Sequence, residues 1–349
     1  MCRPQVKVSM VACGGLHTIA LTVDKKLFSW GIHDDGALGR PTPDSDLWTS
    51  AEKEDAVAEN LPGRMALTEG GRVKSVTAGG GSHTLALMED GRVLGCGSFR
   101  GDSGSLGFSP GTPRQRTLVT VIHGSIRKIS SGENHCLALT TGGQVLTWGC
   151  GERGALARGG EQLTPAPALS PEGVLTGVEG VFAGQQNTFV TTGDGKVYGW
   201  GLNNQGQLGL PPCDPVERAT EISALSKLGG IKDAAGGSHH SLVLAKEGGL
   251  YSFGSPTYGV LGRPDMNVRG INAEPLHEPA LVHVGEDEDG GLPPGARILA
   301  VFAGQTVSQC FVEGHGVYAW GASSEMVLGL GPEVDEVYLP NRVRNANCF

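Results

Sequence analysis

The chain has 349 residues and a formal net charge of −9 at pH 7, which argues against binding nucleic acid through a broad basic surface. Its 57 glycines are about twice the average usage and indicate many tight turns between short strands. No apolar run approaches the roughly 20 residues of a membrane span, and residues 1–5 lead into no apolar segment typical of a signal peptide. The eight cysteines form no C-x-x-C pair, so we expect a reduced, intracellular protein.

One β-rich unit recurs six times along the chain. Each copy usually opens with a polar or His position, runs through an apolar strand and a glycine turn, and closes with an aromatic residue or Cys before Gly. The openings are His17, His83, His135, Asn187, His240 and Val307, and the closing residues are Trp30, Cys96, Trp148, Trp200, Phe253 and Trp320. Opening and closing residues lie 13 positions apart in all six copies. A spacing that is constant in six copies is not expected by chance, so the chain is a repeat protein.

Each of these frames predicts a β-hairpin. In the second copy, residues 84–87 are nearly all apolar, as in a strand covered on both faces, and Asp90-Gly91 supplies the positive φ angles of a tight hairpin loop. A loop ending in Gly-x-Leu-Gly follows the closing residue, as in Gly206-Gln207-Leu208-Gly209. The openings lie 66, 52, 52, 53 and 67 residues apart, a period that suits the four-stranded blade of a propeller.

Two insertions account for the longer intervals. Residues 40–71 hold three prolines and a charged run at 52–55, which predicts a surface loop with one helical turn. Residues 263–295 hold the acidic cluster Glu286-Asp287-Glu288-Asp289. An EF-hand loop needs ligands at alternate positions and a glutamate at position twelve, so a solvated loop is favoured over a calcium site.

Whole phrases of the repeats resemble those of the regulator of chromosome condensation family. They include Gly31-x-x-Asp34-Asp35-Gly36-Ala37-Leu38-Gly39-Arg40, Gly97-Ser98-Phe99-Arg100 and Gly149-Cys150-Gly151-Glu152. The resemblance implies an all-β, seven-bladed β-propeller formed by residues 1–349 as a single domain. Only six copies are recognisable, and no aromatic-Gly pair precedes His17. We therefore expect a ring that is incomplete at the termini, where residues 338–349 at most start another hairpin.

The resemblance also implies a function. The family includes the guanine-nucleotide exchange factor for the small GTPase Ran, which docks on chromatin. We therefore expect a Ran-like GTPase as partner, with no catalytic constellation, cofactor, metal, membrane or small-molecule substrate. The nucleus is favoured over the cytoplasm by the resemblance alone. A non-exchanging propeller that serves as scaffold or adaptor is the alternative, because many relatives share the fold and not the function.

The second copy differs from the others after its closing residue. The closing residue lies 8 positions before the Leu of the Gly-x-Leu-Gly turn, or of its variants at 154–157 and 326–329, in five copies, but Cys96 lies 10 positions before Leu106. The extra residues fall within Arg100-Gly101-Asp102-Ser103-Gly104, where the family carries a β-wedge that presses on the nucleotide-binding side of Ran. A rigid element is expected there, because an exchange factor must favour the nucleotide-free GTPase.

The resemblance assigns further residues that contact the GTPase. The candidate set is His17, Arg100, Asp102, Glu133, Asn134, Arg158 and His239. Two positions depart from the family. Its principal acidic position, directly before the third opening, is Asn134 here, and a second acidic position is Gly81. If exchange requires a carboxylate at the first position, the neighbouring Glu133 has to supply it.

Other residue patterns have structural interpretations. We expect His83 and His135 to be structural histidines whose rings bond to the backbone, and Asp34-Asp35 to be turn residues. Gly149 to Gly154 spells G-x-G-x-x-G, but no helix-forming segment follows it, so a dinucleotide site is not predicted.

Nucleophilic, zinc and DNA-binding chemistry are not predicted either. His135 and Cys136 are adjacent on a strand and point to opposite faces, so they do not form a nucleophile–base pair, and no zinc-ligand spacing occurs. Only Arg3 and Lys7 precede the first hairpin, and residues 158–162 include Glu161. The basic elements through which the family docks on chromatin are therefore not recognisable, and direct DNA binding is not predicted.

Overall fold

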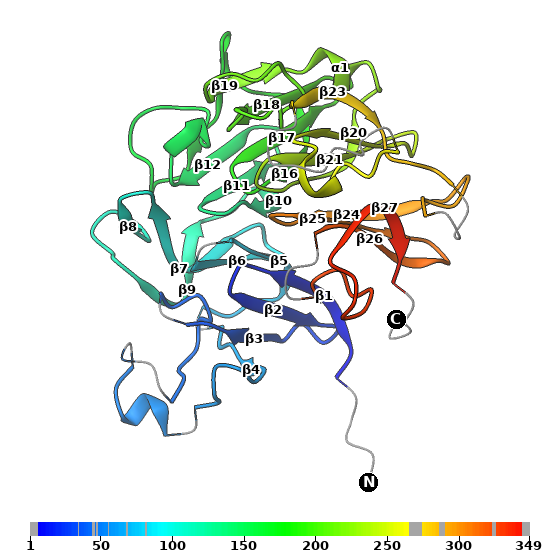
Figure 1. The fold of residues 1–349 in the computed structure, drawn as a ribbon. Coiled ribbons are helices and arrows are strands. Elements are labelled where there is room, and N and C mark those ends of the chain that lie inside the picture. The colour runs from blue at the N-terminus through cyan, green and yellow to red at the C-terminus, as the bar shows by residue number, and fades with distance from the viewer. Residues whose placement is uncertain are drawn as a thin grey trace. The chain divides into compact units, whose positions relative to one another are not determined.

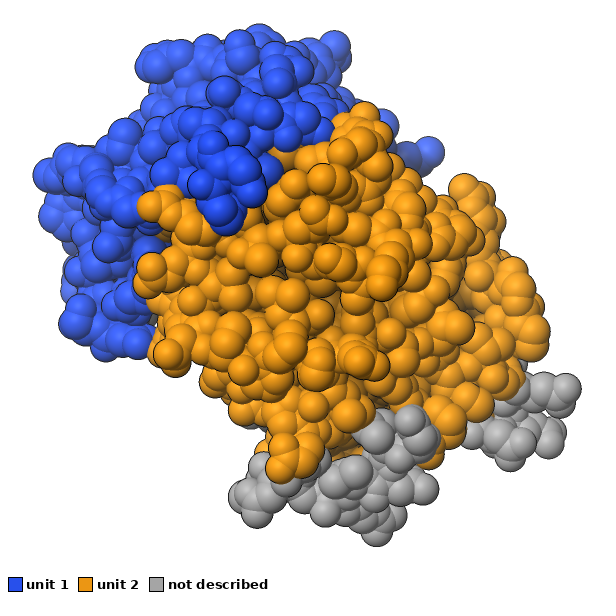
Figure 2. All heavy atoms as spheres, turned by 90° about the horizontal axis from the view of Figure 1, so that it is seen from above, with its two compact units in different colours: residues 1–152, 158–177 blue, residues 153–157, 178–349 orange. Residues whose placement is uncertain are grey.

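The computed structural model of the chain describes residues 6–33, 35–43, 46, 48–54, 56–67, 69–80, 82–264, 274–285, 290–322 and 326–343. Asp34, Gly81 and the acidic cluster at 286–289 lie outside the described residues. The chain groups into two compact units (Figure 2), unit 1 with residues 1–152 and 158–177 and unit 2 with residues 153–157 and 178–349. The single domain expected from the repeats stays a prediction.

Unit 1 holds three antiparallel blades (Figure 1). Blade 1 consists of β1 (Val8–Cys13), β2 (His17–Thr22), β3 (Leu27–Gly31) and β4 (Gly63–Arg64). Blade 2 consists of β5 (Val73–Ala78), β6 (Ser82–Met88), β7 (Val93–Gly101) and β9 (Gln115–Ile122), with β8 (Gly104–Gly107) paired to the end of β7. Blade 3 consists of β10 (Ile126–Ser131), β11 (His135–Thr140), β12 (Val145–Gly149) and β13 (Ala166–Pro167). The short strands β14 (Leu169–Ser170) and β15 (Gly173–Val174) pair with each other.

Unit 2 holds three further blades of the same order. Blade 4 consists of β16 (Val178–Ala183), β17 (Asn187–Thr192), β18 (Val197–Gly201) and β19 (Val216–Glu221). Blade 5 consists of β20 (Ile231–Gly236), β21 (His240–Ala245), β22 (Leu250–Gly254) and β23 (Leu276–Leu281). Blade 6 consists of β24 (Ile298–Ala303), β25 (Val307–Val312), β26 (Gly316–Ala322) and β27 (Glu336–Arg342). The helices are short: η1 (Ala51–Lys53), η2 (Glu152–Gly154), η3 (Thr257–Gly259) and α1 (Ser223–Ser226).

The all-β propeller is as predicted, but the number of blades is six among the described residues rather than seven. The terminal segments explain the difference. Strand β1 precedes the first recognised hairpin and pairs with β2, and β27 follows the last one and pairs with β26. These two strands complete blades 1 and 6 as first and fourth strands. Within the described residues the expected seventh blade is therefore not formed, and residues 344–349 of the expected terminal hairpin lie outside the described residues.

The repeat signals correspond to packed elements. The second strand of each of blades 2 to 5 is almost wholly buried, as expected for a strand covered on both faces. The glycine after each closing residue allows a close approach. Gly97 has a φ of +103°, and a Cβ there would lie 1.9 Å from the Ser82 carbonyl oxygen. Any other residue would be strained at this position.

A carbonyl in the Gly-x-Leu-Gly turn joins blade 5 to blade 6. The Val260 carbonyl accepts hydrogen bonds from Ser308 Oγ and from Trp320 Nε1, each at 2.8 Å. His240 Nε2 lies 2.8 Å from the same Ser308 hydroxyl. Because that hydroxyl gives its only hydrogen to the carbonyl, the ring nitrogen is the donor. We call this arrangement of opening residue, hydroxyl and turn carbonyl the inter-blade network.

The inter-blade network recurs between blades 1 and 2. His17 Nε2 lies 2.9 Å from Thr84 Oγ1, and Thr84 Oγ1 donates to the Ala37 carbonyl at 2.8 Å. The closing Cys96 takes the place of a tryptophan, and its Sγ lies 3.5 Å from the same carbonyl oxygen. Both lone pairs of the turn carbonyl are again occupied.

Between blades 4 and 5 the donors change but the acceptor does not. Ser241 Oγ donates to the Gln207 carbonyl at 2.7 Å. The closing residue Phe253 has no polar hydrogen to donate. The opening residue Asn187 donates to the Gln207 carbonyl at 3.0 Å and to Ser241 Oγ at 3.3 Å. An amide at the opening therefore compensates for the missing donor at the closing position.

Among the described residues, blades 2 and 3 do not form the inter-blade network. The residue after the blade 3 opening is Cys136, and the residue equivalent to Val260 is Ser105, which is exposed on β8. Neither ring nitrogen of His83 has a hydrogen-bond partner among the described residues. The ring packs on Phe99 instead, with centroids 4.7 Å apart. The prediction that backbone groups bond to the His83 ring is therefore wrong. A side-chain partner is also missing in the described part of the chain, because Cys136 stands at the position where blade 2 has the Thr84 hydroxyl.

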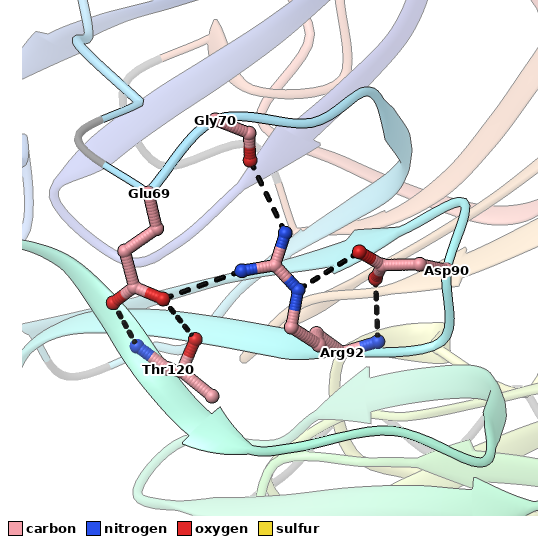
Figure 3. Close-up of polar contacts among 5 residues, drawn as sticks. All are labelled: Glu69, Gly70, Asp90, Arg92 and Thr120. Atoms are coloured by element: carbon pink, nitrogen blue, oxygen red, sulfur yellow. Dashed lines mark hydrogen bonds and ion pairs between the residues drawn. The ribbon is translucent and has the colours of Figure 1, made fainter.

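The first insertion is tied to blade 2 by a polar cluster around Arg92 (Figure 3). Arg92 contacts Glu69 at 3.3 Å, Asp90 at 2.8 Å and the Gly70 carbonyl at 3.3 Å. The Glu69 carboxylate also accepts from the Thr120 hydroxyl and, at 2.9 Å, from its backbone N–H. These bonds hold the pKa of Glu69 below its usual value. The cluster joins the end of the insertion to the β6–β7 turn and to β9.

Substituting Cys136 by Ser should stabilise the protein. The new hydroxyl offers the His83 ring a hydrogen-bond partner, so we expect the free energy of unfolding to rise by about 1 kcal/mol in urea titrations. Cys310 is a matched control, because it is another fully buried thiol on a second strand, within an apolar core cluster. Cys310→Ser should cost about 1–2 kcal/mol. Equal losses in both variants would contradict the role assigned to Cys136.

Stability should fall as the pH drops below about 6.5. Burial lowers the pKa of His240 and His135 to about 4 and that of His83 to about 3. These rings fold in the neutral state, whereas the unfolded chain takes up protons from about pH 6.5 downward, so their contribution is complete above that pH and is lost toward pH 4. His240→Asn, which copies Asn187, should show a shallower loss of melting temperature between pH 7.5 and 5. Parallel curves for the variant and the native chain would contradict this.

Candidate partner-binding site

The end of β7 and strand β8 form a hairpin that only blade 2 carries among the described residues (Figure 1). Strand β7 has nine residues, whereas β3, β12, β18 and β22 have five. Beyond Gly97 it pairs with β8, with Arg100 opposite Ser105 and Gly101 opposite Gly104. Residues 102–106 are exposed. The extra residues counted in the sequence thus lie in this element, the β7–β8 hairpin.

Aromatic packing supports the base of the β7–β8 hairpin. Phe99 is fully buried and lies between the His83 ring and the ring of Phe108, whose centroid is 6.4 Å away in a stacked arrangement. Arg100 follows directly, with about half of its side chain exposed. The hairpin therefore rises from a packed core, and its tip reaches solvent.

A buried carboxylate of blade 1 holds one side of the hairpin. Asp35 lies in the turn of blade 1, and its side chain is 1% exposed. Arg100 Nε donates to Asp35 Oδ2 at 2.7 Å, and a second guanidinium nitrogen of Arg100 contacts the same oxygen. Arg114 Nε lies 3.3 Å from Asp35 Oδ1. A carboxylate this deeply buried needs such cationic partners, since an unpaired charge is costly to desolvate.

Two residues of blade 3 hold the other side. The backbone N–H of Arg100 donates to Asn134 Oδ1 at 3.2 Å, and that of Asp102 donates to Glu152 Oε2 at 2.9 Å. Gly101 lies between these two bonds. A Cβ at Gly101 would lie 2.7 Å from Glu152 Oε1, so the missing side chain lets the carboxylate approach the backbone.

Four of the predicted residues lie together at this place. Arg100 and Asp102 belong to the hairpin, and Asn134 contacts it from the loop before β11. Glu133 adjoins Asn134, and its Cα would lie 3.1 Å from a Cβ at Gly80. The structure thus brings together residues from the hairpin, from blade 2 and from blade 3, all within unit 1.

The other three predicted residues lie elsewhere. His17 is buried in the inter-blade network, and burial lowers its pKa to about 4, against a smaller opposing effect of a backbone hydrogen bond with His83. Arg158 donates to the carbonyls of Thr147 and Glu161 within blade 3 and its loop. Burial lowers the pKa of its guanidinium, and the nearby Glu161 carboxylate offsets part of that shift. Both residues therefore have structural contacts.

His239 belongs to unit 2, is exposed, and has a pKa lowered by partial burial. The structural role of Arg158 extends to other copies. Arg40 and Arg263, which also follow a turn, donate to Ser29 and Ser252 of their own blades.

Sequence reasoning missed the three residues that hold the hairpin from outside. The sequence pattern predicts a turn residue at Asp35 and a glycine-rich phrase around Glu152, and it makes no prediction for Arg114. The available signal was that the insertion must be supported by neighbouring loops. Position 35 or 152 could not be singled out, because their partners lie 65 and 50 residues away.

The described residues form neither a metal cluster nor a membrane-spanning helix. Within the described ranges, no group of three or more His, Cys, Asp or Glu side chains is arranged to hold a metal ion. No helix in the described part of the chain is long and apolar enough to cross a membrane. The acidic cluster at 286–289 lies outside those ranges.

Known proteins resemble this chain over nearly its whole length. The RCC1-like domain family matches residues 2–348. The regulator of chromosome condensation of Xenopus laevis is 33% identical over 359 residues, covering 96% of this chain and 76% of the relative. The guanine nucleotide exchange factor SRM1 of Saccharomyces cerevisiae is 30% identical over 369 residues, covering 98% of this chain and 75% of the relative.

The chain is also similar to a plant receptor and to a yeast protein of known structure. The ultraviolet-B receptor UVR8 of Arabidopsis thaliana is 28% identical over 375 residues, covering 95% of this chain and 81% of the relative. The crystal structure of Prp20p from Saccharomyces cerevisiae, which was described together with its binding to Gsp1p and histones, has a TM-score of 0.81 at 28% identity. The match covers 96% of this chain and 76% of Prp20p. This chain belongs to the RCC1-like family, that of the regulators of chromosome condensation.

Proposed function

We propose that the chain is a guanine-nucleotide exchange factor for a Ran-like small GTPase and acts through the β7–β8 hairpin. The observation that carries this proposal is the hairpin itself, an exposed element anchored to neighbouring loops at Asp35, Asn134 and Glu152. SRM1 is named an exchange factor, and Prp20p was described with its binding to Gsp1p. The sequence identity to both proteins supports the same class of partner here.

The proposed mechanism is preferential binding of the nucleotide-free GTPase. An exchange factor accelerates release only if it binds that state more tightly than the nucleotide-bound state. A hairpin fixed at its base can press on the backbone that surrounds the phosphates. Asp102 places a carboxylate at its exposed tip, and a negative charge there disfavours a neighbouring phosphate. The hairpin would thus act by position and charge, without covalent chemistry.

The acidic position of the family must be filled differently in this mechanism. Asn134 supplies an amide whose oxygen is already bonded to the Arg100 N–H. Glu133 beside it is half-buried and is the carboxylate that we assign to the GTPase contact. His17 and Arg158, with their structural contacts, would act by holding the blades and loops in place.

A scaffold or adaptor function is the second candidate. The neutral Asn134 at the family's acidic position favours it, and the receptor UVR8 is a relative of similar identity that carries another function in its name. Nuclear localisation and a chromatin-associated partner follow from the first candidate. The described association of Prp20p with histones supports a chromatin-associated partner for this chain.

A nucleotide-release assay tests the exchange proposal. The purified chain should accelerate release of fluorescent GDP from a Ran-like GTPase, and Arg100→Ala and Asp102→Ala should each reduce the rate by about tenfold, the equivalent of one charged hydrogen bond. Asp90→Asn is the control, because that carboxylate pairs with Arg92 at the β6–β7 turn of the same blade.

The outcomes separate the two candidates. If the native chain gives no acceleration even in large excess, the exchange function is refuted, and GTPase binding without release would support the adaptor. If the native chain is active and both alanine variants are equally active, the assignment to the β7–β8 hairpin is wrong.

A further inference from the structure

We propose that Asp35 and Glu152 are positioning residues that fix the β7–β8 hairpin from two sides and thereby set its orientation toward the partner. The inference rests on the proposed exchange function for its kinetic consequence, but its structural part can be measured separately. Neither residue belongs to the hairpin: Asp35 lies in the turn of blade 1, and Glu152 lies in η2 of blade 3.

The hairpin needs such support because it is small. Three residue pairs join β7 and β8 beyond the blade, and the register shifts between Phe99 and Arg100. A two-stranded hairpin of this size is marginally stable in water by itself. Its tip, residues 102–106, is exposed and gains no stability from core packing. Contacts from neighbouring blades must therefore determine its position.

Asp35 acts on the side chain of Arg100. The carboxylate is buried, whereas about half of each arginine side chain, Arg100 and Arg114, faces solvent. A charged hydrogen bond to a buried group is stronger than one between exposed side chains. The Arg100 guanidinium is thus fixed at its inner edge, and its outer half is left for a partner. Arg114, which follows β8, binds the other oxygen of the same carboxylate and ties the exit of the hairpin to the same point.

Glu152 acts on the backbone at the tip. It accepts from the Asp102 N–H at 2.9 Å, and its other oxygen lies where a side chain at position 101 would be. The bond fixes the peptide that leads into the turn, so the direction of Asp102 follows from it. Gly101 is required for this approach, which gives an independent reason for a glycine at that position.

Asp35→Asn and Glu152→Gln test the proposal with little change of shape. Arg100 and Arg114 can be hydrated when Asp35 loses its charge, so the blades should stay folded, which circular dichroism and thermal melting would verify. Amide hydrogen exchange of peptides covering residues 98–106 should become about tenfold faster in each variant, because a local opening reports the lost bond. Asp90→Asn, at the Arg92 cluster of Figure 3, should leave exchange in these peptides unchanged.

The kinetic readout separates positioning from binding. On the GTPase we expect kcat for GDP release to fall about five- to tenfold in both variants while KM changes less than about twofold, because the contacts to the partner are kept and only their geometry is loosened. Asp35→Glu, which retains the charge, should restore part of the loss. In an Arg100→Ala background Asp35→Asn should have a smaller effect, because only the Arg114 contact is then lost, whereas Glu152→Gln should lower the rate by the same factor as before.

Each result bears on one claim. If the native chain does not accelerate release, the exchange function fails, yet faster amide exchange in the two variants would still support the anchoring. If the hairpin peptides exchange as in the native chain, the anchoring itself is wrong. If amide exchange becomes faster but both variants release GDP as fast as an active native chain, the two residues do not position the hairpin for nucleotide exchange.

Discussion

The carbonyl group at the second position of the Gly-x-Leu-Gly turn is the constraint on which the blades depend. Ala37, Gln207 and Val260 are buried, and a buried carbonyl must have its lone pairs satisfied. The donors come from the next blade, where the residue after the opening lies directly opposite the closing residue: Thr84 pairs with Cys96, and Ser308 with Trp320. The constant spacing of 13 residues keeps these two side chains side by side on one face of the hairpin. The constant spacing in the sequence thus places two side chains so that both can reach the same carbonyl.

Blade 2 shows what happens when that constraint is released. Its Gly-x-Leu-Gly sequence lies in β8, so Ser105 pairs with Arg100 and is exposed instead of being buried as a turn. Blade 3 correspondingly carries Cys136 at the position that Thr84 fills in blade 2, and the His83 ring packs on Phe99. The hairpin and the inter-blade network therefore exclude each other at this position. Asp35 of blade 1 and Asn134 and Glu152 of blade 3 contact the hairpin instead.

Local patterns in the sequence were enough to predict the strands, the tight turns and the insertion in blade 2, because each depends on residues within about one repeat. The six recognised copies correspond to the six blades of the described residues, and the seventh blade was expected only from the family resemblance. Strand β27 has no aromatic-Gly signal of its own, and its place in blade 6 depends on pairing with β26. The role of Asp35 could not be predicted from the sequence either, since an acidic residue beside glycine is typical of a turn. Only the three-dimensional approach of Arg100 and Arg114 distinguishes it. His17 and Arg158 have internal contacts that the sequence did not indicate, and their role toward a partner stays a prediction.

Charge balance gives a physical reason for Asn134. The loop that carries it already contains Glu133, and the Glu152 carboxylate already accepts from the Asp102 backbone N–H of the hairpin beside it. A carboxylate at position 134 would add a further negative charge beside a backbone N–H that needs only an acceptor. The Asn134 amide supplies that acceptor without the repulsion. Arg100 is meanwhile neutralised by the buried Asp35, so it cannot offset an additional acid at full strength. An amide at position 134 is therefore compatible with a rigid hairpin.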